Sequence, residues 1–387
     1  MKNLWHSSLP AKLHLICLFS FLQLCLITTS VNAVPVIKDP ALRQFGTAQG
    51  LAQDSVRDIV RDQDGFIWVA TEGGLSRWDG YRFVTVEGPK GAFVNNLISN
   101  LCVDDMNRLW ISTDNQGVFY IDLKTDNYQK VLKVADFLQP DWVQSADAFE
   151  YLANGDMAIA LDQVVVRYSP DKQTSTDIFR LSEQELSANE AIRDIKSIGN
   201  QLFVATTSRL YVTSLHDNGQ TVKQLHYLNE QTRTRATQNA KVLYQYAADK
   251  LFVGTVGGLF SIDVDDYLSV TGDEINVNTQ LVLNNRNIWT VVPGTHGEFW
   301  LGTDRGLHRL EKIENEWQSE HVLNPVSGSL ELADKTIHAI LPDELGNLWL
   351  GSNFGGLLFW YAKPLSIETF QNTIRDSKPA LASNIVW

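Results

Sequence analysis

The residues that could perform chemistry are numerous, but they form no recognisable catalytic arrangement. The chain has 45 acidic residues, and glycoside hydrolysis needs two convergent carboxylates. The acidic residues that recur, such as Asp62 and Asp343, lie beside glycines in turn-like sequences, where a carboxylate accepts hydrogen bonds from turn amides. The eight histidines show no His-x-x-x-His spacing, and no Gly-x-Ser-x-Gly or phosphate-loop motif is present. The sequence therefore predicts no catalytic residue, no metal site and no cofactor.

Side chains suited to ligand recognition occur where loops are expected on one face of a repeated unit. Polar and aromatic groups that vary between repeats on a constant scaffold are what a specific binding surface needs, although loops also vary without a function. The candidate ligand-binding residues are Arg305, Asn353, Arg209, Glu72, Asn115, Trp142 and Arg286. Arg305 and Asn353 are preferred, because the clearest repeats fix their positions on the loop.

An internal repeat of about 47 residues positions these loops. An aromatic residue followed by small residues recurs in segments such as 66–75, 298–307 and 347–357. The aligned aromatic residues are Trp68, Trp110, Phe203, Phe252, Trp300 and Trp349, and Ala158 takes the place in the third repeat. A period of roughly 40–50 residues with several short strands is typical of propeller blades. The sequence predicts an all-β fold, a seven-bladed β-propeller of four-stranded blades, with these aromatic residues buried between blades.

Each repeat is expected to contribute four strands joined by glycine-containing turns. Predicted ranges are 56–60 and 288–292 for the first strand, 74–78, 258–262 and 306–310 for the third, and 81–86 and 365–370 for the fourth. The second strand carries the aromatic residue. One or two helical turns are expected near 182–189, and residues 34–380 are predicted to form one closed domain.

Two segments compete for the outer strand of the last blade. Leu42–Phe45 precedes the first repeat, and 366–370 follows the last one. Closure by the N-terminal segment is favoured, because otherwise the two ends of the ring would meet only through side chains and leave an open sheet edge.

The first 33 residues have the layout of a secretory signal peptide. Lys2 and Lys12 precede or flank an apolar run, which ends in small residues at Val31 and Ala33. Cleavage after Ala33 is expected, and an uncleaved membrane anchor is the alternative. The mature chain then has 30 basic and 45 acidic residues, so it repels polyphosphate and nucleic acid is not expected as a partner. Cys102 remains as a single thiol, which we expect to lie in the core.

The first repeat resembles the two-component regulator propeller family. The resemblance rests on Gly50-Leu51, Val56, Ile59, Asp62, Gly65, Trp68, Thr71 and Gly74-Leu75, followed by Trp78-Asp79-Gly80-Tyr81-Arg82-Phe83. It covers nearly all of the mature chain, most clearly in the first, sixth and seventh repeats. The resemblance implies a periplasmic sensor region of a receptor anchored in the inner membrane, with a histidine kinase or diguanylate cyclase as output. It further implies an oligosaccharide or other small ligand, neighbouring receptor domains as partners, and a homodimer of the full-length receptor.

Residues 381–387 look like the first strand of a further repeat, truncated within it, so the chain is expected to be a fragment lacking membrane and output domains. The favoured function is a non-catalytic ligand-sensing propeller. The alternatives are a secreted carbohydrate-active propeller enzyme and a propeller scaffold for protein interactions.

Overall fold

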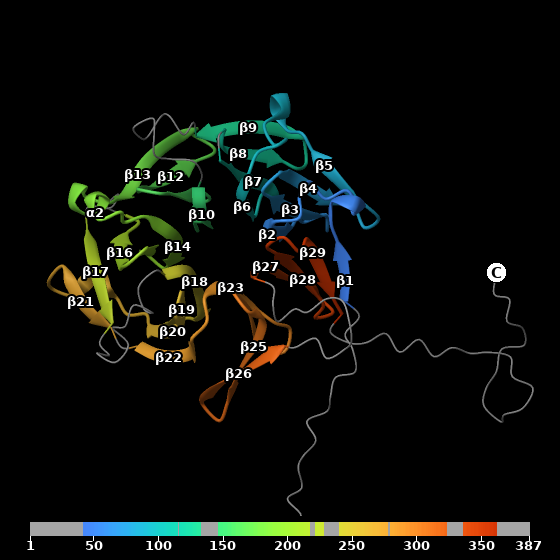
Figure 1. Ribbon diagram of the computed structural model, residues 1–387. Coiled ribbons are helices and arrows are strands. Elements are labelled where there is room, and N and C mark those ends of the chain that lie inside the picture. Colours follow the sequence, from blue (N-terminus) through green and yellow to red (C-terminus); the bar gives the residue numbers. More distant parts are fainter. Residues whose placement is uncertain are drawn as a thin grey trace, which may run out of the picture. The chain divides into compact units, whose positions relative to one another are not determined.

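Short segments with alternating apolar side chains form almost all of the secondary structure. The computed structural model describes residues 42–114, 116–132, 146–216, 221–227, 240–277, 279–322 and 336–361. Their strands form seven separate sheets that stand as blades around one axis (Figure 1). The chain is a seven-bladed β-propeller, as the repeat predicts. Among the described residues, no helix has the length and apolar character needed to span a membrane.

Each blade is an antiparallel sheet whose first strand lies nearest the axis and contacts the first strands of the neighbouring blades. Blades one to three are β2 (Val56–Arg61), β3 (Ile67–Thr71), β4 (Gly74–Trp78) and β5 (Phe83–Val86); β6 (Ile98–Val103), β7 (Arg108–Thr113), β8 (Gly117–Asp122) and β9 (Asn127–Leu132); and β10 (Ala146–Tyr151), β11 (Met157–Leu161), β12 (Val164–Ser169) and β13 (Thr174–Arg180). The third repeat therefore forms a regular blade although Ala158 replaces the aromatic residue.

The remaining blades follow the same plan. They are β14 (Ile192–Ile198), β15 (Gln201–Thr206), β16 (Leu210–Ser214) and β17 (Val222–Tyr227); β18 (Ala240–Ala247), β19 (Lys250–Thr255), β20 (Gly258–Asp263) and β22 (Thr279–Asn284); β23 (Ile288–Pro293), β24 (Phe299–Thr303), β25 (Gly306–Ile313) and β26 (Glu316–Val322); and β27 (Ile337–Pro342), β28 (Leu348–Ser352) and β29 (Leu357–Trp360) with β1 (Leu42–Phe45). The helix α2 (Glu183–Ser187) lies in the connection between blades three and four, where helical turns were expected.

The repeated aromatic residues form the core between blades. Trp68, Trp110, Phe203, Phe252, Trp300 and Trp349 are all buried, with exposed fractions between 0% and 8%. A carboxylate at the preceding turn fixes the indole in the first two blades. Asp62 accepts hydrogen bonds from the backbone amides of Asp64 and Phe66, and from the indole nitrogen of Trp68 at 2.7 Å. Asp104 holds Trp110 in the same way, at 2.8 Å. The recurring acidic residues are therefore explained by turn structure, as the sequence predicts.

The N-terminal strand closes the ring. β1 pairs antiparallel with β29, with Leu42 opposite Trp360 and Phe45 opposite Leu357 (Figure 1, blue beside red). Phe45 is buried and packs against Trp78 and Trp349, with ring centroids 5.2 and 5.7 Å away. Closure by Leu42–Phe45 is confirmed. The competing segment 366–370, the predicted strand 365–370, the predicted signal peptide 1–33 and the segment 381–387 lie outside the described residues.

One sheet has a fifth strand that the sequence did not predict. The connection between β20 and β22 contains β21 (Glu274–Val277), which pairs in parallel with β17 at the outer edge of blade four. Tyr267, Ile275 and Val277 of this connection are buried against blades four and five. This connection therefore links two adjacent blades through both backbone and side chains.

The connections divide into two faces. Loops between second and third strands, together with the connections that enter the first strands, lie on one face, which we call the loop face. The turns after first strands and after third strands lie on the other, which we call the turn face. The five candidate ligand-binding residues that the structure describes, Glu72, Arg209, Arg286, Arg305 and Asn353, belong to connections of the loop face.

Candidate ligand-binding face

Every first strand begins with a β-bulge on the loop face. In blade one, Val56 lies opposite Thr71 and Asp58 opposite Ala70, so Arg57 is an extra, unpaired residue. The same shift occurs in all seven blades, and the extra residues are Arg57, Ser99, Asp147, Arg193, Lys241, Trp289 and His338. A bulge redirects a side chain away from the ordinary alternation of a strand. We call these seven residues the bulge ring.

Neighbouring members of the bulge ring contact one another around the axis. The guanidinium of Arg193 lies 3.7 Å from the carboxylate of Asp147. The ammonium of Lys241 lies 3.4 Å from the ring centroid of Trp289, a cation–π contact. Trp289 and His338 have ring centroids 4.4 Å apart. The seven blades therefore present six residue types from one backbone position, since arginine occurs in blades one and four.

In blades one and four, the residue after the bulge is an aspartate that hydrogen-bonds to the next blade. Asp58 accepts a hydrogen bond from the amide of Leu101 at 2.9 Å, and Asp194 accepts one from the amide of Leu243 at 2.6 Å. Burial raises the pKa of Asp58 to about 6 and that of Asp194 to about 7, although these amide hydrogen bonds favour the charged forms. These carboxylates stabilise the scaffold beneath the bulge ring.

Charged groups in the bulge ring shift one another's pKa values, because they are partly removed from water. Burial, and then the neighbouring Asp162, raise the pKa of Asp147 to about 7 against the opposing effect of Arg193. Burial, and then Arg193, lower the pKa of Lys241 to about 8. Burial, with Arg57 and Lys241 nearby, lowers the pKa of His338 to about 4, so its ring is neutral at pH 7. Such clustering of shifted groups is typical of functional sites, although structural ion pairs cause it too.

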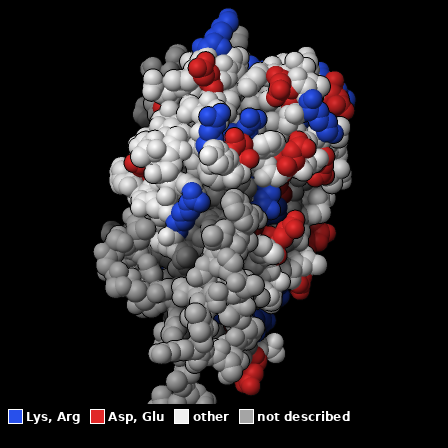
Figure 2. All heavy atoms as spheres, turned by 90° about the vertical axis from the view of Figure 1, so that its right-hand side faces the viewer, with Lys and Arg blue, Asp and Glu red and all other residues white. Residues whose placement is uncertain are grey.

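Figure 2 shows the side of the molecule that carries β1 and β5, where basic and acidic side chains are interspersed. The bulge ring also combines both signs of charge, but at a single repeated backbone position.

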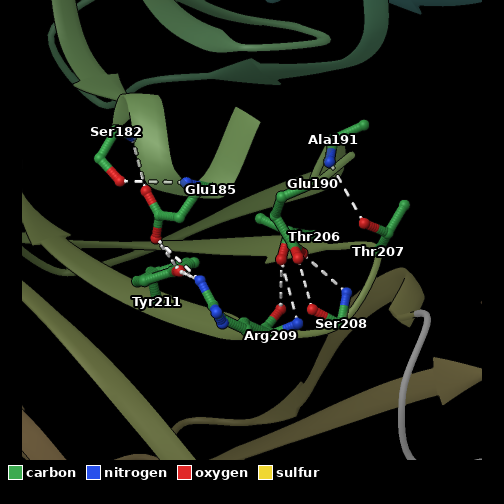
Figure 3. A network of polar contacts seen from close by, with 9 residues as sticks. All are labelled: Ser182, Glu185, Glu190, Ala191, Thr206, Thr207, Ser208, Arg209 and Tyr211. Carbon is green, nitrogen blue, oxygen red and sulfur yellow. Dashed lines mark hydrogen bonds and ion pairs between the residues drawn. The ribbon is translucent and has the colours of Figure 1, made fainter. Parts of the chain in front are cut away.

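Glu72 and Arg209 of the predicted set are committed to contacts within the protein. Glu72 pairs with Arg57 of the bulge ring. Arg209 lies 3.2 Å from the carboxylate of Glu185 on α2 and 3.1 Å from the hydroxyl of Tyr211 (Figure 3). Figure 3 also shows Glu190 accepting hydrogen bonds from Ser208 of the same loop. This network fixes α2 to the loop between β15 and β16.

Arg286 and Arg305 come together at blade six. The guanidinium of Arg286 lies 3.4 Å from the Nε2 atom of His308, whose ring stacks on His321 with centroids 4.5 Å apart. His321 contacts the backbone oxygen of Arg305 at 2.7 Å, while the Arg305 side chain is exposed. Burial, and then His321 and Arg286, lower the pKa of His308 to about 4. His308, which is neutral at pH 7, and the His321 ring stacked on it therefore support the loop that carries Arg305.

Asn353 is half-buried in the loop between β28 and β29. Its backbone N–H donates a hydrogen bond to the backbone oxygen of Thr336 at 3.1 Å. The next residue, Phe354, is 76% exposed and has a φ of 60°. This left-handed conformation is unfavourable for a bulky residue and often marks a functional loop. Asn115 and Trp142 lie outside the described residues.

Sequence reasoning missed the bulge ring, although a signal was present. Each first strand has apolar residues three positions apart, such as Val56 and Ile59 or Ile288 and Val291, where a regular strand would place them two apart. That spacing indicates one extra residue per strand. It would have identified the same position in every repeat.

No metal-binding cluster is found within the part of the chain that the structure describes, where no three His, Cys, Asp or Glu side chains come together. Cys102 is half-buried beside Trp110, and burial raises the pKa of its thiol to about 12. A thiol with so high a pKa is a poor nucleophile at pH 7.

Comparisons with known proteins agree with this architecture. The family model described as two component regulator propeller matches residues 50–73 and 331–354. Histidine kinase P4 of Formosa agariphila is 38% identical over 68 residues, which are 18% of this chain and 4% of the kinase. The chain thus spans a small part of that relative.

Similar solved structures include two from B. thetaiotaomicron, described as extracellular domains of hybrid two component systems. BT3049 matches with a TM-score of 0.62 and 18% identity over 83% of this chain and 42% of that one. BT4673 matches with a TM-score of 0.62 and 20% identity over 83% of this chain and 40% of that one.

A virginiamycin B lyase from Staphylococcus aureus also matches, with a TM-score of 0.59 and 10% identity over 84% of this chain and 99% of the lyase. At such identities the likenesses show the fold alone. The likeness to the two-component regulator propeller family rests instead on the two matched segments, residues 50–73 and 331–354, which belong to the first and last repeats.

Proposed function

We propose that this propeller is a non-catalytic, ligand-sensing domain of a bacterial signal-transduction receptor, working on the periplasmic side of the membrane. The observation that supports it most is the bulge ring, in which one backbone position at the loop-face end of each first strand carries six residue types in seven blades. A rigid scaffold with variable convergent groups is the usual construction of a specific binding site. The two-component regulator propeller repeats support the link to signalling.

The proposed ligand is a small molecule such as an oligosaccharide, bound over the loop face. Neighbouring receptor domains would cover this face in a longer receptor, which we propose acts as a homodimer. A propeller alone keeps only part of the ligand contacts but still loses translational and rotational freedom on binding. We therefore expect affinities on the order of 1 mM for the isolated chain.

Binding is tested by titrating the purified chain with a panel of oligosaccharides and following amide chemical shifts by NMR. Arg305→Ala and Asn353→Ala should each weaken binding several-fold, because both residues lie on loops of the loop face. Arg82→Ala is the matched control, since Arg82 is exposed in a turn of the turn face. Equal weakening by all three substitutions would contradict a site on the loop face.

The likeness to a lyase calls for a specific test of the alternative function, a carbohydrate-active propeller enzyme. Each ligand found should be recovered unchanged after prolonged incubation with the chain. Turnover that one carboxylate substitution abolishes would replace the sensor proposal with an enzyme.

A further inference from the structure

The bulge ring divides into two arcs that differ in how well their polar groups are paired. Ser99, Asp147 and Arg193 of blades two to four have partners within the protein. The Ser99 hydroxyl contacts the hydroxyl of Ser112 at 2.9 Å and the backbone oxygen of Ala146 at 3.2 Å. Arg193 lies between Asp147 at 3.7 Å and Asp162 at 4.0 Å. This arc is internally balanced in charge.

The second arc consists of Lys241, Trp289, His338 and Arg57, on blades five, six, seven and one. Its polar groups are not all paired within the protein. Among the described residues, none forms an ion pair with the Lys241 ammonium, whose close contact is the Trp289 ring. The indole nitrogen of Trp289 and the Nε atom of Arg57 are buried donors that find no acceptor within the part of the chain that the structure describes. Leaving a buried donor unpaired costs free energy, so such groups in a native site call for a missing acceptor.

Three donors, on blades five, six and one, therefore require acceptor oxygens, and two of the three side chains carry positive charge. A carboxylate or sulfate group meets both requirements, because it supplies several acceptors and a negative charge. A neutral hydroxyl would satisfy one donor but supply no negative charge beside Lys241, on which Asp304 acts more weakly than Arg193 does. Glu72 pairs with Arg57 through the terminal Nη2 nitrogen, so the guanidinium has a counterion while its Nε–H still needs an acceptor.

We propose that the arc of Lys241, Trp289, His338 and Arg57 binds the carboxylate or sulfate group of an anionic ligand. This inference rests on the proposed function and deepens it, because it names the ligand class for the loop face. The neutral His338 ring adds a group that can donate or accept a hydrogen bond beside the anion. Arg305 and Phe354, on loops of the same face, are available to contact the rest of the ligand.

The test follows the indole NH resonance of Trp289, assigned through Trp289→Phe, in three titrations with glucuronate, inorganic sulfate and glucose. We expect glucuronate to shift this resonance and glucose to leave it unchanged. A shift with sulfate alone would assign the arc to a free inorganic anion. A shift with glucuronate alone, or a stronger one, would assign it to an anionic group carried by a sugar.

Lys241→Gln should weaken glucuronate binding about tenfold or more, because it removes a charge-assisted hydrogen bond. Lys241→Arg keeps the charge and should retain most of the affinity. Lys172→Gln is the matched control on the turn face, where Lys172 is exposed. Melting curves establish that each variant is folded.

Equal glucuronate affinity in the parent and in Lys241→Gln would overturn this inference. Binding of glucose and glucuronate with equal affinity, at resonances of the loop face, would overturn it too while leaving the proposed function intact. The absence of any ligand at the loop face across the wider panel would instead remove the proposed function.

Discussion

Individual residues of the bulge ring show how one backbone feature can serve several chemical purposes. Arg57, Asp147 and Trp289 occupy the same backbone position in different blades but pair with a loop carboxylate, a guanidinium and an ammonium, respectively. The local backbone is constant because each bulge sits in the same register against the second strand. Side-chain identity alone therefore sets what each blade contributes to the loop face.

Asp147 should make the stability of the protein depend on pH in a predictable direction. Its folded pKa, about 7, lies above the ordinary value of 3.8, so the folded state holds the proton more tightly than the unfolded chain. The resulting stabilisation is complete below the ordinary pKa and is lost as the pH rises through about 7. Asp147→Asn cannot ionise, so its melting temperature relative to the parent should increase between about pH 4 and about pH 8.

The melting temperatures of the variant and the parent are compared at each pH by calorimetry. The opposite effects of His308 and His338 on the pH dependence of stability are present in both proteins, so they largely cancel in the difference. Asp126→Asn, which alters an exposed turn carboxylate, is the control and should give a difference that stays nearly flat. A flat difference for Asp147→Asn as well would mean that this carboxyl is ionised in the folded protein near its ordinary pKa.

At the scale of single residues, the sequence predicted the contacts between residues that lie close together in the chain. The Asp62 turn and the burial of Trp68 follow from residues six positions apart, so the motif contains both partners. The contacts of Lys241 with Trp289 and of Arg209 with Glu185 join different blades or a distant helix. Their partners depend on how blades pack, which no local motif specifies.

Two elements connect the ends of blades beyond their own hairpins. β1 adds the outer strand of blade seven from the opposite end of the chain, and β21 adds a parallel strand to blade four from within blade five. The first was predicted over the competing segment 366–370, because pairing by the N-terminal segment avoids an open sheet edge where the two ends of the ring meet. The second was missed, because segment 264–278 has no counterpart in the other repeats and carries no repeat signal.

Removing β1 should destabilise the whole ring. Deleting residues 34–46 from the mature chain takes away the backbone pairing with β29 and the buried Phe45 ring, and it exposes a sheet edge. We expect the melting temperature to fall by several degrees, as measured by circular dichroism. Deleting only residues 34–38 is the matched control, since it leaves Leu42–Phe45 in place. Identical melting of both truncated chains would contradict closure by β1.

The whole molecule is held together by interfaces shared between blades. The cluster around Phe203 combines residues of blades four and five, and the cluster around Trp68 combines blades one and two. Because each blade completes its core with side chains of the next, a blade that unfolds alone would expose the apolar surface of its neighbour. We therefore expect the propeller to unfold as one cooperative unit.

Trp110→Ala tests this cooperativity from the second blade. Trp110 is fully buried, so the substitution should cost about 3–5 kcal/mol, the usual loss for a large buried aromatic residue. Denaturation followed by circular dichroism and by tryptophan fluorescence should give coincident single transitions in parent and variant. Two separated transitions in the variant would show that blade two can unfold without the rest.

At this scale the repeat was sufficient for the architecture. A period of about 47 residues predicted the number of blades, the number of strands and the buried aromatic positions. The loop face was predicted as well, because strand order determines which connections share a face. The arrangement of charges around the axis was not predicted. It arises only when residues from seven repeats, which are far apart in the sequence, meet near the axis.

The closure by β1 also bears on how such a chain could have grown by duplication of its gene segments. Because the strand that completes blade seven is encoded before blade one, the genetic unit is offset from the structural blade by one strand. Insertion or loss of a whole unit inside the gene would leave both ends of the ring compatible, and the same N-terminal strand would complete whichever blade came last. An inheritance of this kind allows the number of blades to change between descendants while every intermediate remains a closed ring.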